Sequence, residues 1–296
     1  MSPAKRTPPP PPAPALPWAA LNIAHCMFAP PPALDFVIPG LVAGTVGSIV
    51  APGATGKSWL ALQIAAQVAT GADTLDLGPV PQGRVLYLAA EDPADVLHAR
   101  VHTLAQVLNP AQREALAGQL FVLPTLGQTG DLLDDGQTAA KVAAAAEGCR
   151  LVVLDTLSRW HCGDENDRSD AARVMRTLER ICDSTGATVL FLHHTNKSAA
   201  LEGNGDKQQA SRGSSVFVDD ARFVMTMTTC TEAEARDFGI DDAMRSFFVK
   251  LTFAKCNYVP PQRGLWLRKR DGGRLEQVPM FKQPKRQVRK GGEDDF

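Results

Sequence analysis

The sequence predicts an α/β fold: a mainly parallel sheet flanked by helices, with antiparallel strands added in the C-terminal part. Three observations predict it. Short, nearly continuous apolar runs alternate with stretches of helical periodicity up to about residue 190, which is typical of a parallel sheet buried on both faces. A glycine-bearing turn joins the first apolar run to the first helical stretch. Beyond residue 220 the runs lengthen and alternate between apolar and polar residues, as antiparallel strands do.

The elements are predicted in the following order. Apolar runs predict strands at residues 45–50, 84–89, 119–123, 151–155 and 188–193. Helical periodicity predicts helices near residues 57–70, 93–108, 136–147 and 169–185. The late strands are expected at residues 222–228, 246–253 and 264–268, as an antiparallel extension of the same sheet. A hairpin turn is expected at Gly272-Gly273.

Composition divides the chain into four parts. Residues 1–17 are rich in proline and alanine and are expected to be disordered or polyproline-like. Residues 18–32 contain a short amphipathic segment, an arm that could pack on the domain or reach a neighbouring subunit. Residues 33–278 are expected to form one large α/β domain, and residues 279–296 a charged, flexible tail.

The bulk properties exclude several classes of protein. A net charge of −1 rules out a global basic field, so any DNA contact has to come from local loops. The six cysteines lie far apart with no Cys-x-x-Cys pair, which argues against a zinc site and fits a reducing cytoplasm. No apolar stretch is long enough to span a bilayer, and prolines stand where a signal peptide needs its apolar core. We therefore expect a cytoplasmic protein with no membrane partner.

A phosphate-binding loop is predicted where the first strand meets the first helix. Its sequence is Ala-Pro-Gly-Ala-Thr-Gly-Lys-Ser, with Ala51 where the common pattern has glycine. Backbone N–H groups and the helix dipole would surround the β-phosphate, Lys57 would reach the β- and γ-phosphates, and Ser58 would offer its hydroxyl to Mg²⁺. The alternative is a simple turn before a core helix. The expected ligand is ATP or GTP, and the predicted binding residues are Pro52, Gly53, Ala54, Thr55, Gly56, Lys57 and Ser58.

Carboxylates follow two of the predicted strands. Asp155 closes an apolar run in the manner of a Walker B strand, and we expect it to hold Mg²⁺ through water. Glu91 and Asp92 follow another strand, and Glu91 is the predicted base that deprotonates the attacking water. Asp92 is expected to cap a helix whose first residue is Pro93, although that capping could be the whole role of the pair. Arg100 could pair with Glu91 and orient it, although an ordinary surface arginine is the more frequent case.

Polar residues after the strand at 188–193 are candidates for sensing the nucleotide. Strand alternation places the rings of His193 and His194 on opposite sides, and we assign the sensor role to His194. The alternative is a histidine with a structural role only. The polar loop 196–215 follows it and could change order with nucleotide state. Its Lys197, Lys207 and Arg212 suit the phosphates of single-stranded DNA, without base recognition because the loop has no aromatic residue. The alternative is an ordinary surface loop.

Two cations on the late strands are distant in sequence from the phosphate-binding loop. If the chain assembles into a ring, one of the two, Arg222 or Lys255, could reach the γ-phosphate of a neighbouring subunit. Otherwise they are edge-strand charges that discourage aggregation.

The order of these features resembles the RecA-like ATPase core. More closely, it resembles the RepA-type hexameric replicative helicases of IncQ-like plasmids, from about Ala29 to Arg274. The matching motifs include Ala90-Glu-Asp-Pro93, Val153-Leu-Asp-Thr-Leu157, Phe191-Leu-His-His194 and the block Gln208-Gln-Ala-Ser-Arg-Gly-Ser-Ser-Val216. The last block is the most specific, since many unrelated ATPases share the phosphate-binding motif.

That resemblance implies a RecA-like ATPase domain over residues 33–278 and a homo-hexamer with ATP and Mg²⁺ between subunits. It also implies single-stranded or forked DNA in a central channel, 5′→3′ translocation in plasmid replication, and plasmid initiator or primase proteins as candidate partners. By position, Glu91 resembles the catalytic glutamate, His194 the γ-phosphate sensor, Arg222 the arginine finger and Lys255 a second cation acting in trans. The chain departs from the family in its long proline-rich N-terminus and at residues 158–170.

A rival interpretation is a RecA-like regulatory or DNA-maintenance ATPase switch that unwinds nothing. Its proline-rich N-terminus and charged tail would then bind a protein partner. Stimulation of ATP turnover by single-stranded DNA, together with ring assembly, separates the two interpretations.

Overall fold

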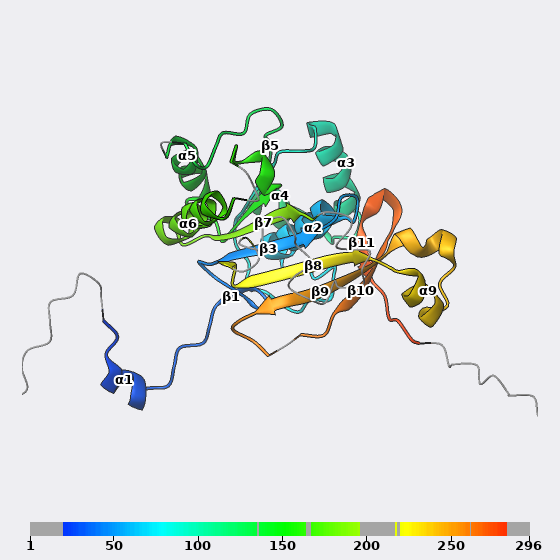
Figure 1. The fold of residues 1–296 in the computed structure, drawn as a ribbon, viewed down its shortest axis with the longest axis horizontal. Helices are drawn as coiled ribbons and strands as arrows, with labels where there is room; N and C mark the ends of the chain where they lie inside the picture. The colour runs from blue at the N-terminus through cyan, green and yellow to red at the C-terminus, as the bar shows by residue number, and fades with distance from the viewer. Residues whose placement is uncertain are drawn as a thin grey trace, which may run out of the picture. The chain divides into compact units, whose positions relative to one another are not determined.

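The computed structural model describes residues 20–134, 136–163, 167–195, 217, 220–260 and 262–282 (Figure 1). The chain divides into two units, Met1–Leu34 and Asp35–Phe296. The first unit contains α1 (Ile23–Phe28), which begins after Asn22, whose side chain accepts a hydrogen bond from the His25 N–H at 3.0 Å. The segment 1–17 predicted to be disordered, and most of the predicted tail 279–296, lie outside the described residues.

The second unit is built on a nine-stranded sheet in the order β11-β10-β9-β8-β3-β7-β6-β4-β5. Its strands are β3 (Val46–Ala51), β4 (Val85–Ala89), β5 (Leu120–Pro124), β6 (Leu151–Asp155), β7 (Thr188–His194), β8 (Phe223–Thr229), β9 (Phe248–Cys256), β10 (Leu265–Lys269) and β11 (Leu275–Gln277). The six strands from β8 to β5 are parallel, and β9, β10 and β11 are antiparallel. A separate small sheet pairs β1 (Phe36–Ile38) with β2 (Leu41–Val42).

This architecture confirms the predicted fold class and corrects one detail. The strand predicted at 222–228 was expected to be antiparallel, but β8 lies parallel to β3. Its threonines give the sequence an alternating pattern, whereas most of the strand is buried, as parallel strands are. The antiparallel extension therefore begins with β9.

Helices cover both faces of the sheet (Figure 1). One core cluster packs α2 (Lys57–Thr70), α3 (Ala94–Ala105) and α4 (Pro110–Gln119) on one face, and a second packs α5 (Gln137–Ala146) and α6 (Arg168–Thr185) on the other. The sequence pattern did not predict α4, because its apolar side chains are few. It begins at a capping box in which the Asn109 side chain accepts from the Gln112 N–H at 2.9 Å.

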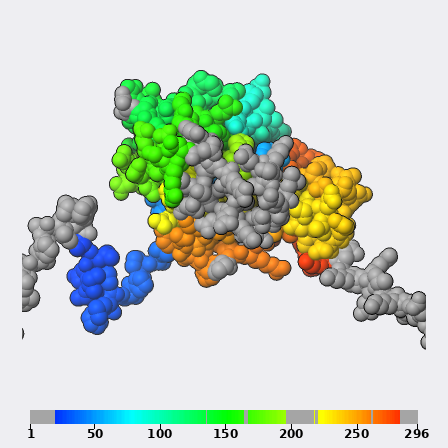
Figure 2. All heavy atoms as spheres, viewed as in Figure 1, coloured from blue at the N-terminus to red at the C-terminus, as the bar shows by residue number. Residues whose placement is uncertain are grey.

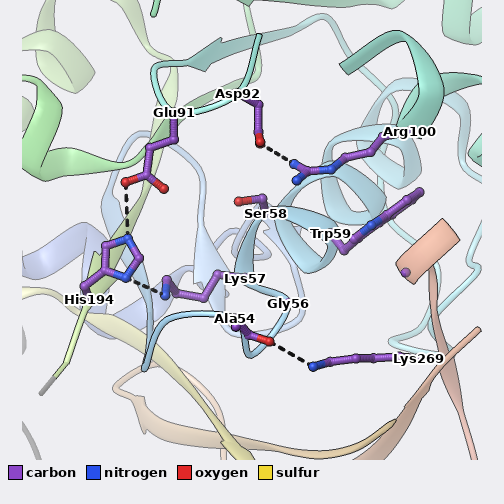
Figure 3. A pocket seen from close by; sticks show the side chains of 11 residues that line it. Ala54, Gly56, Lys57, Ser58, Trp59, Glu91, Asp92, Arg100, His194 and Lys269 are labelled. Carbon is purple, nitrogen blue, oxygen red and sulfur yellow. Dashed lines mark hydrogen bonds and ion pairs between the residues drawn. The ribbon is translucent and has the colours of Figure 1, made fainter. Parts of the chain in front are cut away.

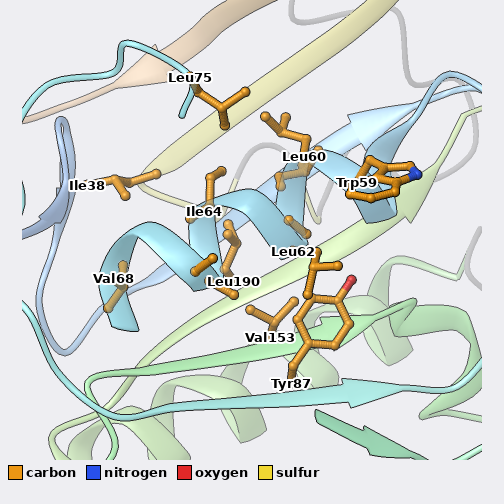
Figure 4. Packing of buried hydrophobic residues seen from close by; sticks show 14 of the residues in the cluster. Ile38, Trp59, Leu60, Leu62, Ile64, Val68, Leu75, Tyr87, Val153 and Leu190 are labelled. Carbon is orange, nitrogen blue, oxygen red and sulfur yellow. The ribbon is translucent and has the colours of Figure 1, made fainter. Parts of the chain in front are cut away.

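Helix α2 runs through the middle of its core cluster, and 13 of its 14 residues are buried (Figure 4). Leu62 and Ile64 lie in one cluster with Tyr87 and Val153 from the sheet. Such a helix is fixed by apolar packing along its whole length, which contributes roughly 1.5–3 kcal/mol for each large side chain fully buried. The loop at its N-terminus therefore starts from a rigid base.

A buried glutamine fastens the C-terminal hairpin β10–β11 to α2. The Gln63 side chain donates to the Leu275 carbonyl at 2.9 Å and accepts from the Leu275 N–H at 2.8 Å. Both groups are buried, so the pair satisfies two backbone polar atoms that water cannot reach.

We expect Gln63→Ala to lower the free energy of unfolding by about 2–4 kcal/mol, because it leaves the Leu275 N–H and carbonyl without partners. Denaturant titration measures the effect. The matched control Gln106→Ala removes an exposed glutamine and should change that free energy by less than about 0.5 kcal/mol. Equal stabilities of the two variants would contradict the structural role of the Gln63 side chain.

Helix α9 (Glu232–Phe238) lies beside the antiparallel strands, and its Phe238 ring packs on the Trp266 ring of β10 at 5.4 Å between centroids. On the face drawn in Figure 2, the gold segment of α9 and the orange strands are adjacent. None of the helices described by the structure combines the length and apolar character needed to cross a membrane.

Candidate functional site

A cavity of about 350 Å³ opens at the carboxyl end of the central strand β3 (Figure 3). Parallel strands that point their carboxyl ends to one edge, with a helix leaving that edge, form the usual ligand site of such sheets. The lining residues are Ala54, Gly56, Lys57, Ser58, Trp59, Glu91, Asp92, Arg100, His194, Lys269 and Gly273.

The predicted phosphate-binding loop forms the floor of this cavity. Gly56 has φ 109° at the N-cap of α2, and Ala54 is a non-glycine residue with φ 62°. The Thr55 hydroxyl donates to the Pro52 carbonyl at 2.8 Å, which closes the turn from inside. The helix N-terminus, with its unpaired N–H groups, thus faces the cavity and favours an anion there.

Lys57 is the buried cation of the loop. Its ammonium donates to the carbonyls of Ala51 at 2.8 Å and Pro52 at 3.0 Å. Burial lowers the pKa of Lys57 to about 8, although the charges of Glu91 and Asp155 oppose that shift. The side chain therefore remains mostly protonated at neutral pH and available to a phosphate.

Ser58 and Asp155 provide the oxygen atoms suited to Mg²⁺, and Tyr87 holds the Asp155 carboxylate in place. The Ser58 hydroxyl donates to Asp155 Oδ1 at 3.1 Å, and the Tyr87 hydroxyl donates to Asp155 Oδ2 at 2.7 Å. Burial raises the pKa of Asp155, and these two hydrogen bonds counteract the shift. A hydroxyl beside a buried carboxylate fits the hard-oxygen preference of Mg²⁺, and a bound ion would neutralise phosphate charge here.

A continuous chain of contacts joins Lys57 to Glu91 through His194. The Lys57 ammonium lies 3.0 Å from His194 Nδ1, and His194 Nε2 lies 3.3 Å from Glu91 Oε1. One imidazole tautomer satisfies both contacts: Nδ1 accepts from the ammonium and the Nε2–H donates to the carboxylate. That hydrogen bond is the largest cause that lowers the pKa of Glu91, against the opposing effect of burial.

Two further groups approach the Glu91 carboxylate. The Thr156 hydroxyl donates to Glu91 Oε1 at 3.3 Å, and the Arg159 guanidinium lies 4.0 Å from the same oxygen. Glu91 is thus ionised and oriented at the rim of the cavity, where it can accept a proton from water.

The structure corrects the prediction for Asp92. The N-cap of α3 is Pro93, without a side-chain cap, because the helix begins one residue later than expected. The Asp92 carboxylate instead accepts from the Arg100 guanidinium at 2.5 Å. Of the two possibilities left open for Arg100, a pair with Glu91 or a surface position, the structure shows neither: Arg100 is paired with Asp92, and these two charges balance each other on the wall of the cavity.

The two histidines of β7 point to opposite sides, as strand alternation predicts. His194 lines the cavity, whereas His193 is buried with its ring centroid 5.3 Å from that of Phe217. Burial, together with the nearby positive charges, lowers the pKa of His193 to about 4.

That shift predicts acid sensitivity. Between about pH 4 and 6.5 the unfolded chain binds more protons at residue 193 than the folded chain does, so stability falls as the pH drops through this window. We expect His193 to account for about 2 kcal/mol of the stability lost between pH 7 and pH 5. Denaturant titrations at both pH values should show that His193→Leu loses less stability than wild type between pH 7 and pH 5. Identical losses in both proteins would contradict the shift.

Arg222 and Lys255 lie away from the cavity of their own chain. Arg222 precedes Phe223, which pairs with Gly47 near the start of β3, and Lys255 pairs with Val224. The phosphate-binding loop leaves the other end of β3, about 15 Å away along a strand of this length. The structure thus gathers Lys57, Ser58, Glu91, Asp155 and His194 at one edge of the sheet and leaves these two cations at the opposite edge.

The predicted DNA-binding residues Lys197, Lys207 and Arg212 lie outside the described residues. Sequence reasoning did not identify Trp59, Lys269 and Gly273 as residues of the cavity. The one related prediction was the hairpin turn at Gly272-Gly273. The sequence pattern did not show that this hairpin folds back onto α2.

Comparisons with known proteins found one family model and several solved structures. A family model described as an AAA domain matches residues 10–200. A solved structure described as the ATPase domain of G40P has a TM-score of 0.55 and 13% identity, covering 82% of this chain and 88% of that one. The structure of the RadB recombinase has a TM-score of 0.47 and 16% identity, covering 80% and 92%. The similarity to the G40P domain supports a RecA-like P-loop NTPase fold. Since the family model spans well over half of the chain, the protein belongs to this AAA domain family.

Proposed function

We propose that this chain is an ATP-dependent, hexameric, RepA-type DNA helicase that serves plasmid replication and translocates 5′→3′ on single-stranded DNA. Lys57 and the loop backbone bind the ATP phosphates, Ser58 and Asp155 hold Mg²⁺, and Glu91 deprotonates the attacking water. His194 senses the γ-phosphate, because its ring joins the loop lysine to the base.

The proposed ring assembly rests on the distance between two cations and the phosphate-binding loop of the same chain. Arg222 and Lys255 lie at the edge of the sheet opposite the phosphate-binding loop of the same chain. Neither can serve its own cavity, whereas both could serve that of a neighbour in a closed head-to-tail ring.

The coupling to DNA rests on the order of the chain after the sensor. β7 ends at His194, and the segment that contains Lys197, Lys207 and Arg212 follows directly. A change at His194 when the γ-phosphate leaves would be transmitted to this segment along the shortest covalent path.

The test is strand separation on forked DNA with 5′-tailed and 3′-tailed controls, while ATP turnover is recorded in the same reaction. We expect unwinding that needs both ATP and the 5′ tail, and turnover that single-stranded DNA stimulates. ATP turnover without unwinding or DNA stimulation would replace the helicase proposal with the regulatory switch.

A mixing experiment tests the trans action of Arg222. We expect Arg222→Ala to bind nucleotide but turn over less than about a tenth as much ATP as wild type. Added Lys57→Ala subunits are themselves inactive but carry an intact Arg222, so activity should return at roughly a quarter of the interfaces of an equal mixture. No recovery at any mixing ratio would mean that Arg222 does not complete a neighbour's site.

A further inference from the structure

The hairpin β10–β11 forms a wall of the nucleotide cavity that the proposed mechanism leaves unused. Gln63 ties Leu275 to α2 from both sides, and the Leu275 side chain packs against Gly56 in the phosphate-binding loop. At the tip, Gly273 approaches Trp59 so closely that an added Cβ would lie 2.6 Å from its indole nitrogen. The wall is therefore fixed relative to the loop.

This wall presents one cation to the loop. The Lys269 ammonium donates to the Ala54 carbonyl at 2.9 Å, across 215 residues of sequence. Ala54 has the left-handed backbone conformation that costs an L-residue roughly 1–2 kcal/mol, and its carbonyl is the hydrogen-bond partner of the amine among the residues that the structure describes. Figure 3 shows Ala54 and Gly56 between Lys57 and Lys269.

The charges that line the cavity are unevenly paired. On one side, Asp92 accepts from Arg100 and Glu91 accepts from His194. Lys269, by contrast, has no carboxylate within ion-pair distance among the residues that the structure describes. Burial lowers the pKa of Lys269. A half-buried, uncompensated ammonium on the wall of a phosphate cavity is a site for an anion.

We propose that Lys269 is a second phosphate-binding cation, acting within its own subunit on the nucleotide diphosphate at the end of the loop remote from Glu91. The inference rests on the proposed function, since it deepens the same site. Lys57 lies beside His194 and serves the phosphate that is cleaved. Lys269 ends strand β10 of the hairpin. When a nucleotide binds, its ammonium exchanges the Ala54 carbonyl for a phosphate oxygen that ATP and ADP both carry.

This assignment predicts a particular kinetic signature. An interaction made equally with substrate and transition state changes KM without changing kcat. We expect Lys269→Gln to raise the KM for ATP and the dissociation constant for ADP by the same factor, roughly 10-fold, with kcat within about 2-fold of wild type. Steady-state ATP turnover and titration with a fluorescent ADP analogue measure these values.

The choice of glutamine separates charge from tethering. A glutamine amide can still donate to the Ala54 carbonyl, so a residue that only tethers the loop would leave both constants unchanged in Lys269→Gln. Lys269→Arg keeps the charge and should restore affinity to within about 3-fold of wild type. The matched control is Arg268→Met, which removes a charge from the next residue, whose guanidinium lies 5.6 Å from the centroid of the Phe248 ring. It should leave both constants unchanged.

The outcomes distinguish this inference from the proposed function. If wild-type protein hydrolyses ATP and Lys269→Gln binds ADP normally, the inference is wrong and the proposed function stands. A lower kcat with unchanged ADP affinity would also overturn it, because Lys269 would then act on the transition state. Thermal unfolding of each ligand-free variant checks that the fold is intact, and Lys269→Met, which also removes the charge, replaces Lys269→Gln as the test if that variant does not fold. Failure of wild-type protein to bind ADP would overturn both.

Discussion

Replacement of Lys57 by alanine is expected to reduce ATP turnover by a factor on the order of 10³ or more. The ammonium is buried, contacts two loop carbonyls, and is the cation of the loop nearest to Glu91 and His194. Neither of the other two cations that the structure places at the cavity wall can take its place, because Lys269 lies beyond Ala54 and Arg100 is held by Asp92. Steady-state turnover with saturating ATP measures the loss.

The control for Lys57 is Lys141→Ala, which removes an exposed lysine from α5 on the other face of the sheet and should leave turnover unchanged. Thermal unfolding of both variants verifies that they fold. Turnover in Lys57→Ala within about 10-fold of wild type would show that the phosphates bind elsewhere, since losing one charge-stabilising donor at the reacting group costs about 10²–10³.

The parts of this protein that depend on local sequence were predictable. The strand–loop–helix at Ala51–Ser58 and the buried strand that ends in Asp155 are contiguous segments. Their apolar pattern predicts both the kind of secondary structure and the residues that form it. Parallel strands bring their carboxyl ends to one edge, so Glu91, Asp155 and His194 were expected near the loop, and the structure places them there.

The parts that depend on long-range contacts were not predictable in the same way. The sequence predicted a helix N-terminus as the partner of Asp92 and offered Glu91 as a partner of Arg100, whereas the folded chain pairs Arg100 with Asp92. The contact of Lys269 with Ala54 and the double hydrogen bond of Gln63 with Leu275 join segments more than 200 residues apart. No periodicity indicates such pairs, because they depend on how the hairpin folds back over α2.

Replacement of Glu91 by glutamine is expected to lower kcat by roughly 10²–10⁴-fold and to leave ADP affinity within about 3-fold of wild type. The amide keeps the size of the side chain and can still accept hydrogen bonds from Thr156 and His194, but it cannot take a proton from water. Single-turnover kinetics with pre-bound ATP separate the chemical step from binding and product release.

The matched control for Glu91 is Asp92→Asn, the neighbouring carboxylate on the same wall, which pairs with Arg100. If Glu91 is the base, Asp92→Asn should lower kcat by less than about 10-fold, because its partner is a structural charge rather than the reacting water. Equal losses in the two variants would mean that the wall acts only through its charge. If the chemical step is slow in Glu91→Gln but not in Asp92→Asn, the proton transfer is assigned to Glu91. His194 and Lys57 are unchanged in both variants, so sensing of the γ-phosphate stays assigned to His194.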